Sequence, residues 1–556
     1  MSKSTSILTL AFSLLWSAWA TSAPLDNLLQ QCRALTLAPV SFDPNQSLTE
    51  NLVLLERADL ARYNLSDAID YQKSRWGSHF SRDQHGLLLA CQQRIASQHK
   101  QRLQQLLREG WPERLKASSN PEFANLAKRW LQLYQKDALN QQPLAQLSQF
   151  AEFRARLKAS RAKIDLTKID CQLSDNSISM AQVPSYLINQ ADENCRRTVW
   201  QAYQLRGGDA VEQLLARIYQ QQREQAKRAG YREVAEHQLS RNWLSEVDWV
   251  YQYLLASYSK DHAAAPWQLA RLLKQDSELS ETSDSIQVLT DTAEELGLRL
   301  EGLQDNYFRV WLEQRLLGEL RVNWQDGDIG SWVIRQSIVG VQVGVVELQA
   351  PANISLARQQ HKYHMAIARA LKSLAAGSRF YWNNRIGLHA EASHLASYWL
   401  SAMWQPRFGL TQAQFDSRRN LHNARALQAL TDNHSQLERP TDLFSKRFGE
   451  SAPEVELRFA SQARLGANVY QSLWAQDAGR WLALRHQNQC LPLDSIFNTL
   501  FVNANGAGLT KQFQQLVGLS SPPQINQRML NEISDSHTAN QPCSVRYSGK
   551  SAATQR

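Results

Sequence analysis

Apolar residues recur at three- and four-residue spacing along most of this 556-residue chain, which is the spacing of amphipathic helices. The pattern is plain between residues 27 and 160, as at Leu103 and Leu106, and it returns at 199–274 and 356–485. Glycine and proline are sparse in the first of these stretches, and strand-like alternation is absent there. The sequence therefore predicts a mainly helical fold.

One stretch near the middle of the chain departs from the helical pattern. Several short segments there are rich in Val, Ile, Trp and Tyr and are separated by polar turns such as Asp326-Gly327-Asp328. This composition between turn residues is typical of strands. The segments are 307–312, 317–324, 332–336 and 341–348. We therefore expect one small sheet of about four strands at about residues 305–350.

The first residues of the chain predict export. Lys3 precedes a largely apolar run from Ile7 to Trp19, and small residues stand at Ala18 and Ala20. This is the composition of a secretory signal peptide, too short to span a bilayer, with cleavage expected after Ala20. No later segment reaches the roughly 18 apolar residues that a spanning helix needs. We expect a periplasmic or secreted protein without a membrane span in its mature chain.

Six cysteines agree with export into an oxidising compartment. None of them forms a C-x-x-C pair, so we interpret them as disulfide partners and not as metal or redox groups. Short loops close at a lower entropic cost than long ones, which favours pairs of neighbours. The pairs expected on this ground are Cys171 with Cys195, Cys32 with Cys91, and Cys490 with Cys543.

The charge and the short motifs narrow the classes of function. The formal net charge is +9, but the basic residues are scattered and form no Lys/Arg block. We interpret them as surface residues and expect no nucleic-acid partner. The sequence contains no G-x-G-x-x-G, Walker or G-x-S-x-G pattern, so nothing in it indicates a phosphate-binding loop or a nucleophile elbow.

Two segments carry a recognisable combination of motifs. The first runs from Arg196 to Glu236 and includes Arg223 and Gly230-Tyr231, and the second is 466–474 (GANVYQSLW), followed by Asp477. The first resembles the R-x-x-x-x-x-A-x-x-x-G-[YF] signature of the thimet oligopeptidase and oligopeptidase A family of zinc metallopeptidases. The second is similar to that family's G-Y-Y-S-Y-L-W…D helix. The resemblance covers about residues 30–490 and implies a two-lobed helical ellipsoid around a deep central channel, with a small sheet.

The zinc ligands of that family are not found in this chain. In the family, two His of an H-E-x-x-H helix and a Glu of a second helix hold zinc, and the first motif's Glu activates water. No H-E-x-x-H occurs here. Residues 393–399 (SHLASYW) fit the family's S-Q-x-x-E-Y-W, which places Ala390 at the ligand Glu. The preceding helix, expected at 364–376, then has Met365 and Arg369 at the His positions and Ala366 at the catalytic Glu.

These replacements imply a family member without zinc catalysis. Arg369 has no free lone pair for a metal, and its guanidinium would instead replace part of the ion's positive charge. Of the family's catalytic Tyr residues only Tyr470 is retained, and Ser472 stands where a second is expected. The resemblance then implies a monomer without a cofactor, which keeps its channel to bind short peptides or an unidentified protein partner.

Two other hypotheses remain open. His364, Glu391 and His394 lie on or beside the same two helices and could form a displaced zinc site in an active metallopeptidase that cleaves short peptides. The competing interpretation of these His residues is that they are ordinary surface or capping residues. A third hypothesis is a scaffold protein whose channel is closed and filled by Trp and Leu.

The chain is expected to have four parts. A signal peptide (1–20) precedes an N-terminal helical region (21–195). A peptidase-like helical region with the small sheet follows (196–490). A C-terminal helix and a loose, Ser/Asn/Thr/Gln-rich tail end the chain (491–556).

Overall fold

The structure is a computed structural model that describes residues 25–139, 144–163, 171, 177–258, 264–274, 278–385, 389–437, 448 and 457–535. The expected signal peptide, residues 1–20, and the expected tail beyond residue 535 lie outside these described residues. Within them the fold is mainly helical and includes small sheets, which confirms the predicted fold class. The central channel that the resemblance implies stays a prediction.

The N-terminal part is a group of helices: α2 (Leu48–Trp76), α3 (Arg82–Arg108), α4 (Trp111–Ala117) and α5 (Pro121–Leu139). Helices α2 and α3 each begin after a serine that caps the first turn. Ser47 accepts a hydrogen bond from the backbone of Glu50, and Ser81 accepts one from Gln84, with the side chains of Glu50 and Gln84 returning to the capping residues. These reciprocal bonds satisfy backbone donors that the first turn leaves free. The group packs around the buried Trp111.

Short helices and strands connect this group to the sheet. They are α6 (Leu144–Ala159), β1 (Arg161–Lys163), β2 (Ser177–Ser179), α7 (Val183–Asn189), α8 (Glu193–Gln204), α9 (Gly208–Arg228), α10 (Val234–Leu239), α11 (Val247–Ala256), α12 (Leu269–Lys274), β3 (Glu278–Asp284) and α13 (Ser285–Glu295). Strands β1 and β2 pair with each other, and β3 pairs with β9 (Asn353–Leu356).

Two of the three predicted disulfides are confirmed. Cys32 is bonded to Cys91 with the Cα atoms 5.9 Å apart, and Cys171 is bonded to Cys195 with the Cα atoms 5.4 Å apart. The third prediction involves Cys543, which lies outside the described residues. Both confirmed bonds join segments that are near each other in the sequence, as the argument from loop length expected.

The main sheet has five strands: β4 (Leu298–Gln304), β5 (Tyr307–Leu312), β6 (Arg315–Trp324), β7 (Gly330–Arg335) and β8 (Gly344–Ala350). Their order is β4-β5-β6-β8-β7; β6 and β8 are parallel, and the other neighbours are antiparallel. The four predicted strands are confirmed within a few residues, and β4 was missed. Gly318 lets a helix approach closely, because a Cβ atom there would lie 2.5 Å from the side chain of Leu374.

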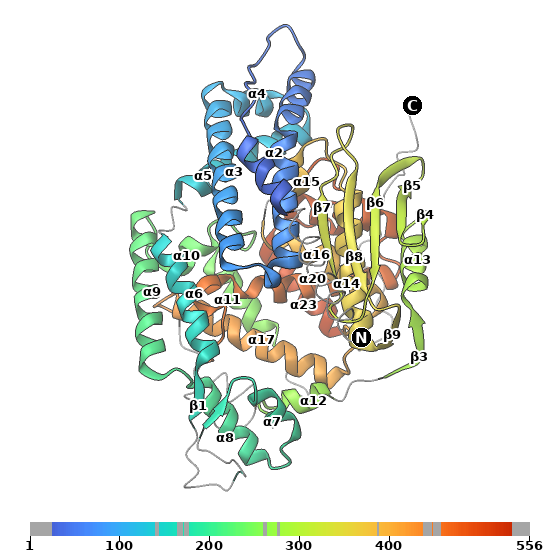
Figure 1. The fold of residues 1–556 in the computed structure, drawn as a ribbon. Helices are drawn as coiled ribbons and strands as arrows, with labels where there is room; N and C mark the ends of the chain where they lie inside the picture. Colours follow the sequence, from blue (N-terminus) through green and yellow to red (C-terminus); the bar gives the residue numbers. More distant parts are fainter. Residues whose placement is uncertain are drawn as a thin grey trace, which may run out of the picture.

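Helices after the sheet build the rest of the core: α14 (Ala357–Ala375), α15 (Tyr381–Arg385), α16 (Ala392–Trp404), α17 (Gln412–Asp432), α19 (Gln462–Leu465), a 3₁₀ turn (Gly466–Tyr470), α20 (Gln471–Gln487), α21 (Leu493–Phe497), a π-helical turn (Asn498–Val502), α22 (Leu509–Val517) and α23 (Pro522–Asp535). Figure 1 shows the sheet at one side, with α14, α16 and α20 behind it and the N-terminal helices beside α15. One apolar core joins the sheet to these helices and includes Leu320, Leu371, Trp399 and Trp474.

Candidate functional site

The positions that the resemblance assigns to zinc lie on or beside α14 and α16. These two helices pack against each other, and α16 also packs along α20. The α16–α20 crossing is close because α20 has glycine at position 479, where a Cβ atom would lie 2.6 Å from the backbone nitrogen of Trp399. The three elements that carry the compared motifs therefore meet in one place, although the first of the helices begins at Ala357 and not at His364 as predicted.

The four replaced positions differ in their exposure to solvent. Met365 and Ala366 are buried on α14, whereas Arg369 and Ala390 are exposed. A thioether is a soft ligand that suits copper(I) better than zinc, and alanine and arginine offer no lone pair. Because Arg369 is exposed, its guanidinium does not fill a buried position left by an ion. These side chains do not fit zinc.

The inward position next to Ala390 is taken by Glu391, whose residue is only 1% exposed. Its Oε1 atom accepts hydrogen bonds from the backbone nitrogens of Trp243 and Leu244, at 3.0 and 3.1 Å, and from the hydroxyl of Tyr470 at 2.6 Å. Burial, reinforced by the neighbouring Glu391 carboxyl, holds the pKa of Tyr470 well above its usual value, so the phenol stays protonated and donates. We call these four residues the Glu391 lock.

The histidines of the displaced-site hypothesis occupy different surroundings. His364 is buried, lies flat on Trp404 with ring centroids 5.4 Å apart, and burial lowers its pKa to about 4. His394 is exposed at the start of α16 and contacts Tyr398 edge-on. No three His, Cys, Asp or Glu side chains in the described part of the chain are grouped so that they could hold a metal. The displaced zinc site therefore stays a hypothesis without a ligand set in this part of the structure.

Asp477, the last residue of the second motif, is part of a buried ion pair. Its two carboxylate oxygens accept from Nε and an Nη of Arg419 at 3.0 and 2.7 Å, and the hydroxyl of Tyr253 donates to the same carboxylate at 2.7 Å. Asp477 is 1% exposed. The pair joins α20 to α17 and α11, so this motif residue connects three helices and faces no open site.

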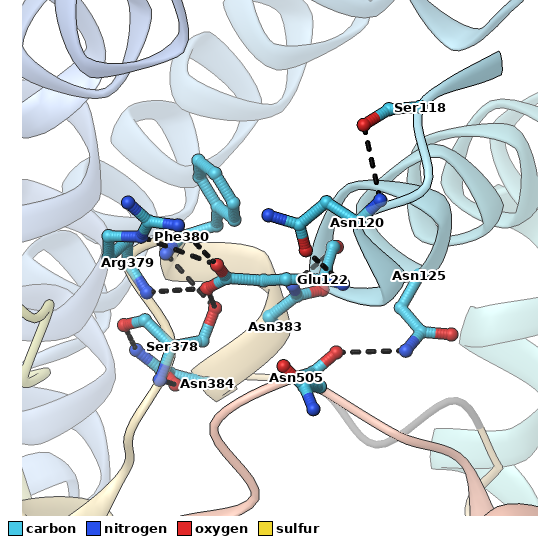
Figure 2. Close-up of polar contacts among 10 residues, drawn as sticks. All are labelled: Ser118, Asn120, Glu122, Asn125, Ser378, Arg379, Phe380, Asn383, Asn384 and Asn505. Atoms are coloured by element: carbon cyan, nitrogen blue, oxygen red, sulfur yellow. Dashed lines mark hydrogen bonds and ion pairs between the residues drawn. The ribbon is translucent and has the colours of Figure 1, made fainter. Parts of the chain in front are cut away.

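The segment between α14 and α16 is held by a carboxylate from the N-terminal helices, a feature that the sequence analysis missed. Glu122 of α5 accepts from the hydroxyl of Ser378 at 2.7 Å and from the backbone nitrogen of Arg379 at 2.9 Å (Figure 2). Its other oxygen pairs with the Arg379 guanidinium at 3.2 Å. Asn383 adds a bond to the Glu122 carbonyl and in turn accepts from Arg129.

Helix α2 holds the same segment with further buried acids. Glu56 accepts from the backbone nitrogen of Tyr381 at 3.1 Å, and Asp67 accepts from the Tyr381 hydroxyl at 2.7 Å. Asp67 also accepts from the backbone nitrogen of Gln336 in the segment after β7. The only sequence signal for this contact is that Glu56 stands on the apolar stripe of α2, four residues after the buried Leu52. Charged residues are rarely fully buried without a partner.

The buried Glu56 predicts a specific pH dependence of stability. Burial raises the pKa of Glu56 from 4.5 to about 8. Because the folded protein holds this proton more tightly than the unfolded chain, the contribution of Glu56 to stability falls as the pH rises from about 4.5 to about 8. Relative to Glu56→Gln, the wild-type protein should lose up to about 1.4 kcal/mol of unfolding free energy per pH unit in this window.

Urea unfolding at pH 6, 7 and 8 checks this prediction. His99, whose pKa burial lowers to about 3, is present in both proteins, so its own pH dependence cancels in the difference. Parallel pH profiles for the two proteins would contradict a protonated Glu56 in the folded state.

The comparisons with known proteins add no family to this geometry. No model of a known protein family matches the chain, and no curated protein sequence matches it. None of the helices in the described ranges combines the length and the apolar composition that crossing a bilayer requires.

Proposed function

We propose that this chain is an exported relative of the thimet-type zinc oligopeptidases that binds short peptides and does not cleave them. The observation that carries the proposal is the Glu391 lock. The carboxyl nearest to the family's ligand position is only 1% exposed, and its Oε1 atom is occupied by two backbone N–H groups and Tyr470, while its Oε2 atom is buried without a partner and faces no open site. Glu391 and Tyr470, which lie at or next to positions compared with the family's active site, therefore join α16, the 3₁₀ turn and the segment before α11.

The proposed loss of catalysis also rests on the residues at the other positions. Met365, Ala366, Arg369 and Ala390 supply neither a zinc ligand nor a general base. Peptide binding in a channel comes from the family resemblance alone. Export is supported by the sequence of the first residues and is compatible with the two disulfides, since such bonds persist in oxidising compartments.

Metal and activity measurements test the proposal together. We expect the purified mature chain to contain no stoichiometric zinc by mass spectrometry of the metals. We expect no chelator-sensitive cleavage of internally quenched fluorescent peptides, with an active zinc oligopeptidase as the positive control. Fluorescently labelled short peptides should bind saturably, measured by fluorescence anisotropy. Stoichiometric zinc together with chelator-sensitive cleavage would overturn the proposal.

Variants separate the remaining hypotheses. If cleavage is seen and comes from a displaced site, His394→Ala should abolish it, because His394 is exposed and its replacement leaves the core intact. The exposed Ser393 is the matched control, and Ser393→Ala should not change the rate. Absence of zinc, cleavage and peptide binding together would favour the closed scaffold.

A further inference from the structure

A pocket of about 220 Å³ opens between α2, α3 and α15. It belongs to the N-terminal helices and to the segment they hold, and none of its lining residues is in the Glu391 lock. Pockets for drug-sized ligands typically have about 300–1,000 Å³. This pocket is smaller, so a ligand that fills it has about the size of one amino acid. The residues that line it and enter the argument are Arg62, Tyr63, Asp70, Ala96, His99 and Trp382.

Aromatic rings form one wall of the pocket. Tyr63 of α2 stacks on Tyr381 of α15 with ring centroids 4.0 Å apart and planes at 5°. Trp382 stands edge-on to Tyr63 at 5.9 Å and lies against His99 of α3 at 4.5 Å. Such rings offer large apolar surfaces that favour offset or edge-on contact with another aromatic ring.

Two nitrogen donors beside this wall have no acceptor. Arg62 donates one Nη to Asp59 at 2.7 Å and the other to Nδ1 of His99 at 3.1 Å, but its Nε is buried without a partner. A guanidinium has no acceptor, so Nδ1 of His99 must accept and the ring proton lies on Nε2. That Nε2 is also buried without a partner. Burial lowers the pKa of His99 to about 3, so the ring is neutral and keeps this single donor.

Paired charges lie behind and beside the wall. The carboxylate of Asp59 is shared by two guanidinium groups, Arg62 at 2.7 Å and Arg102 at 3.1 Å. The next carboxyl on this face of α2, Glu56, holds its proton at neutral pH because burial raises its pKa to about 8. Two guanidinium groups therefore share one carboxylate on this side of the pocket. Asp70 also lines the pocket with a side chain that is 48% exposed, and it shares Arg385 with the buried Asp67.

We propose that this pocket binds a small aromatic carboxylate, with the ring against Tyr63 and Trp382 and the carboxylate beside Arg62 and His99. A buried donor without an acceptor is unfavourable, and a carboxylate placed beside Arg62 and His99 supplies an acceptor. The ligand is either a free aromatic acid or the C-terminal aromatic residue of a peptide. This site is independent of the function proposed above, because it shares no residue with α14 or α16.

Isothermal titration calorimetry with three probes tests the chemistry. N-acetyl-L-phenylalanine carries both the ring and the carboxylate, N-acetyl-L-phenylalaninamide lacks the charge, and N-acetyl-L-alanine lacks the ring. We expect saturable one-to-one binding of the first and at least about tenfold weaker binding of the other two. Equal affinity for all three probes, or no heat with any of them, overturns the proposal.

Variants locate the binding. Ala96 of α3 lines the pocket and is exposed, so Ala96→Trp should block the pocket, weaken binding at least about tenfold and shift the melting temperature by no more than about 2 °C. The neighbouring Ser97 is exposed and does not line the pocket, so Ser97→Trp is the matched control and should bind normally. His99→Phe keeps a ring against Trp382 but removes the donor, and it should also weaken binding. Equal affinities of the Ala96→Trp and Ser97→Trp proteins would place the ligand elsewhere.

A further pair of probes identifies the source of the carboxylate. An N-blocked tetrapeptide that ends in phenylalanine is titrated as the free acid and as the amide. Tight, Ala96→Trp-sensitive binding of the acid identifies a peptide C-terminus as the ligand, and binding confined to the single amino acid identifies a free aromatic acid. If Ala96→Trp leaves peptide binding unchanged, the peptide binds in the proposed channel. The titration with N-acetyl-L-phenylalanine then decides whether the pocket binds an aromatic acid.

Discussion

Replacing Glu391 by alanine is expected to lower the free energy of unfolding by about 3–5 kcal/mol, because three buried donors lose their common acceptor. The backbone nitrogens of Trp243 and Leu244 and the hydroxyl of Tyr470 all bond to its Oε1, and the residue is only 1% exposed to solvent. Urea unfolding followed by circular dichroism measures the loss. Hydrogen exchange should rise at the backbone amides of Trp243 and Leu244.

Glu391→Gln is the matched control for this prediction. An amide oxygen keeps an acceptor at the same place, so the loss should be smaller, about 1–2 kcal/mol. A Glu391→Ala protein as stable as the wild type would contradict the lock. Such a result would return Glu391 to the set of residues free to bind a metal.

Replacing Asp477 by alanine is expected to cost a similar amount, about 3–5 kcal/mol, because it leaves the Arg419 guanidinium buried without its counter-charge. Both carboxylate oxygens bind Arg419, and the Tyr253 hydroxyl donates to one of them. Thermal and urea unfolding measure the effect. The core around α17 and α20 should unfold faster, and hydrogen exchange of its backbone amides measures this change.

Asp494 provides the comparison for Asp477. It is exposed at the start of α21, so Asp494→Ala removes the same group where solvent compensates for it, and stability should change by less than about 0.5 kcal/mol. Equal effects of the two replacements would show that the buried pair contributes nothing specific. Neither variant should change zinc content or peptide cleavage if the proposed function is correct.

The strands show which parts of the fold a local sequence pattern can predict. The four segments rich in Val, Ile, Trp and Tyr became β5 to β8, because β-branched and aromatic residues fit a pleated, partly buried surface. Strand β4 was missed because it is an edge strand, mostly exposed, with Arg299, Glu301 and Gly302 among its residues. Its identity comes from pairing with β5, which is a tertiary contact and leaves little mark on composition.

At the candidate site, too, the sequence predicted the helices but not the tertiary contacts. The motif alignment predicted the two helices, one with Met365, Ala366 and Arg369 and the other with 393–399, although the first begins earlier than predicted, at Ala357. The motif alignment could not predict which side chain points into the core. The inward residue is Glu391, and Ala390 and Arg369 face solvent. One step along a chain that enters a helix changes direction by about 100°, so a short register difference reverses burial.

The sequence by itself determined that the chain is mainly helical, where its main sheet lies, that Cys32 pairs with Cys91 and Cys171 with Cys195, and that it has no H-E-x-x-H to hold zinc. Only the tertiary structure decided what the acids do. Glu391 bonds a backbone nitrogen 148 residues away, and Glu122 bonds a hydroxyl 256 residues away. Periodicity and loop closure act over a few residues, whereas a buried carboxyl is stabilised by whichever donors the folded chain brings to it.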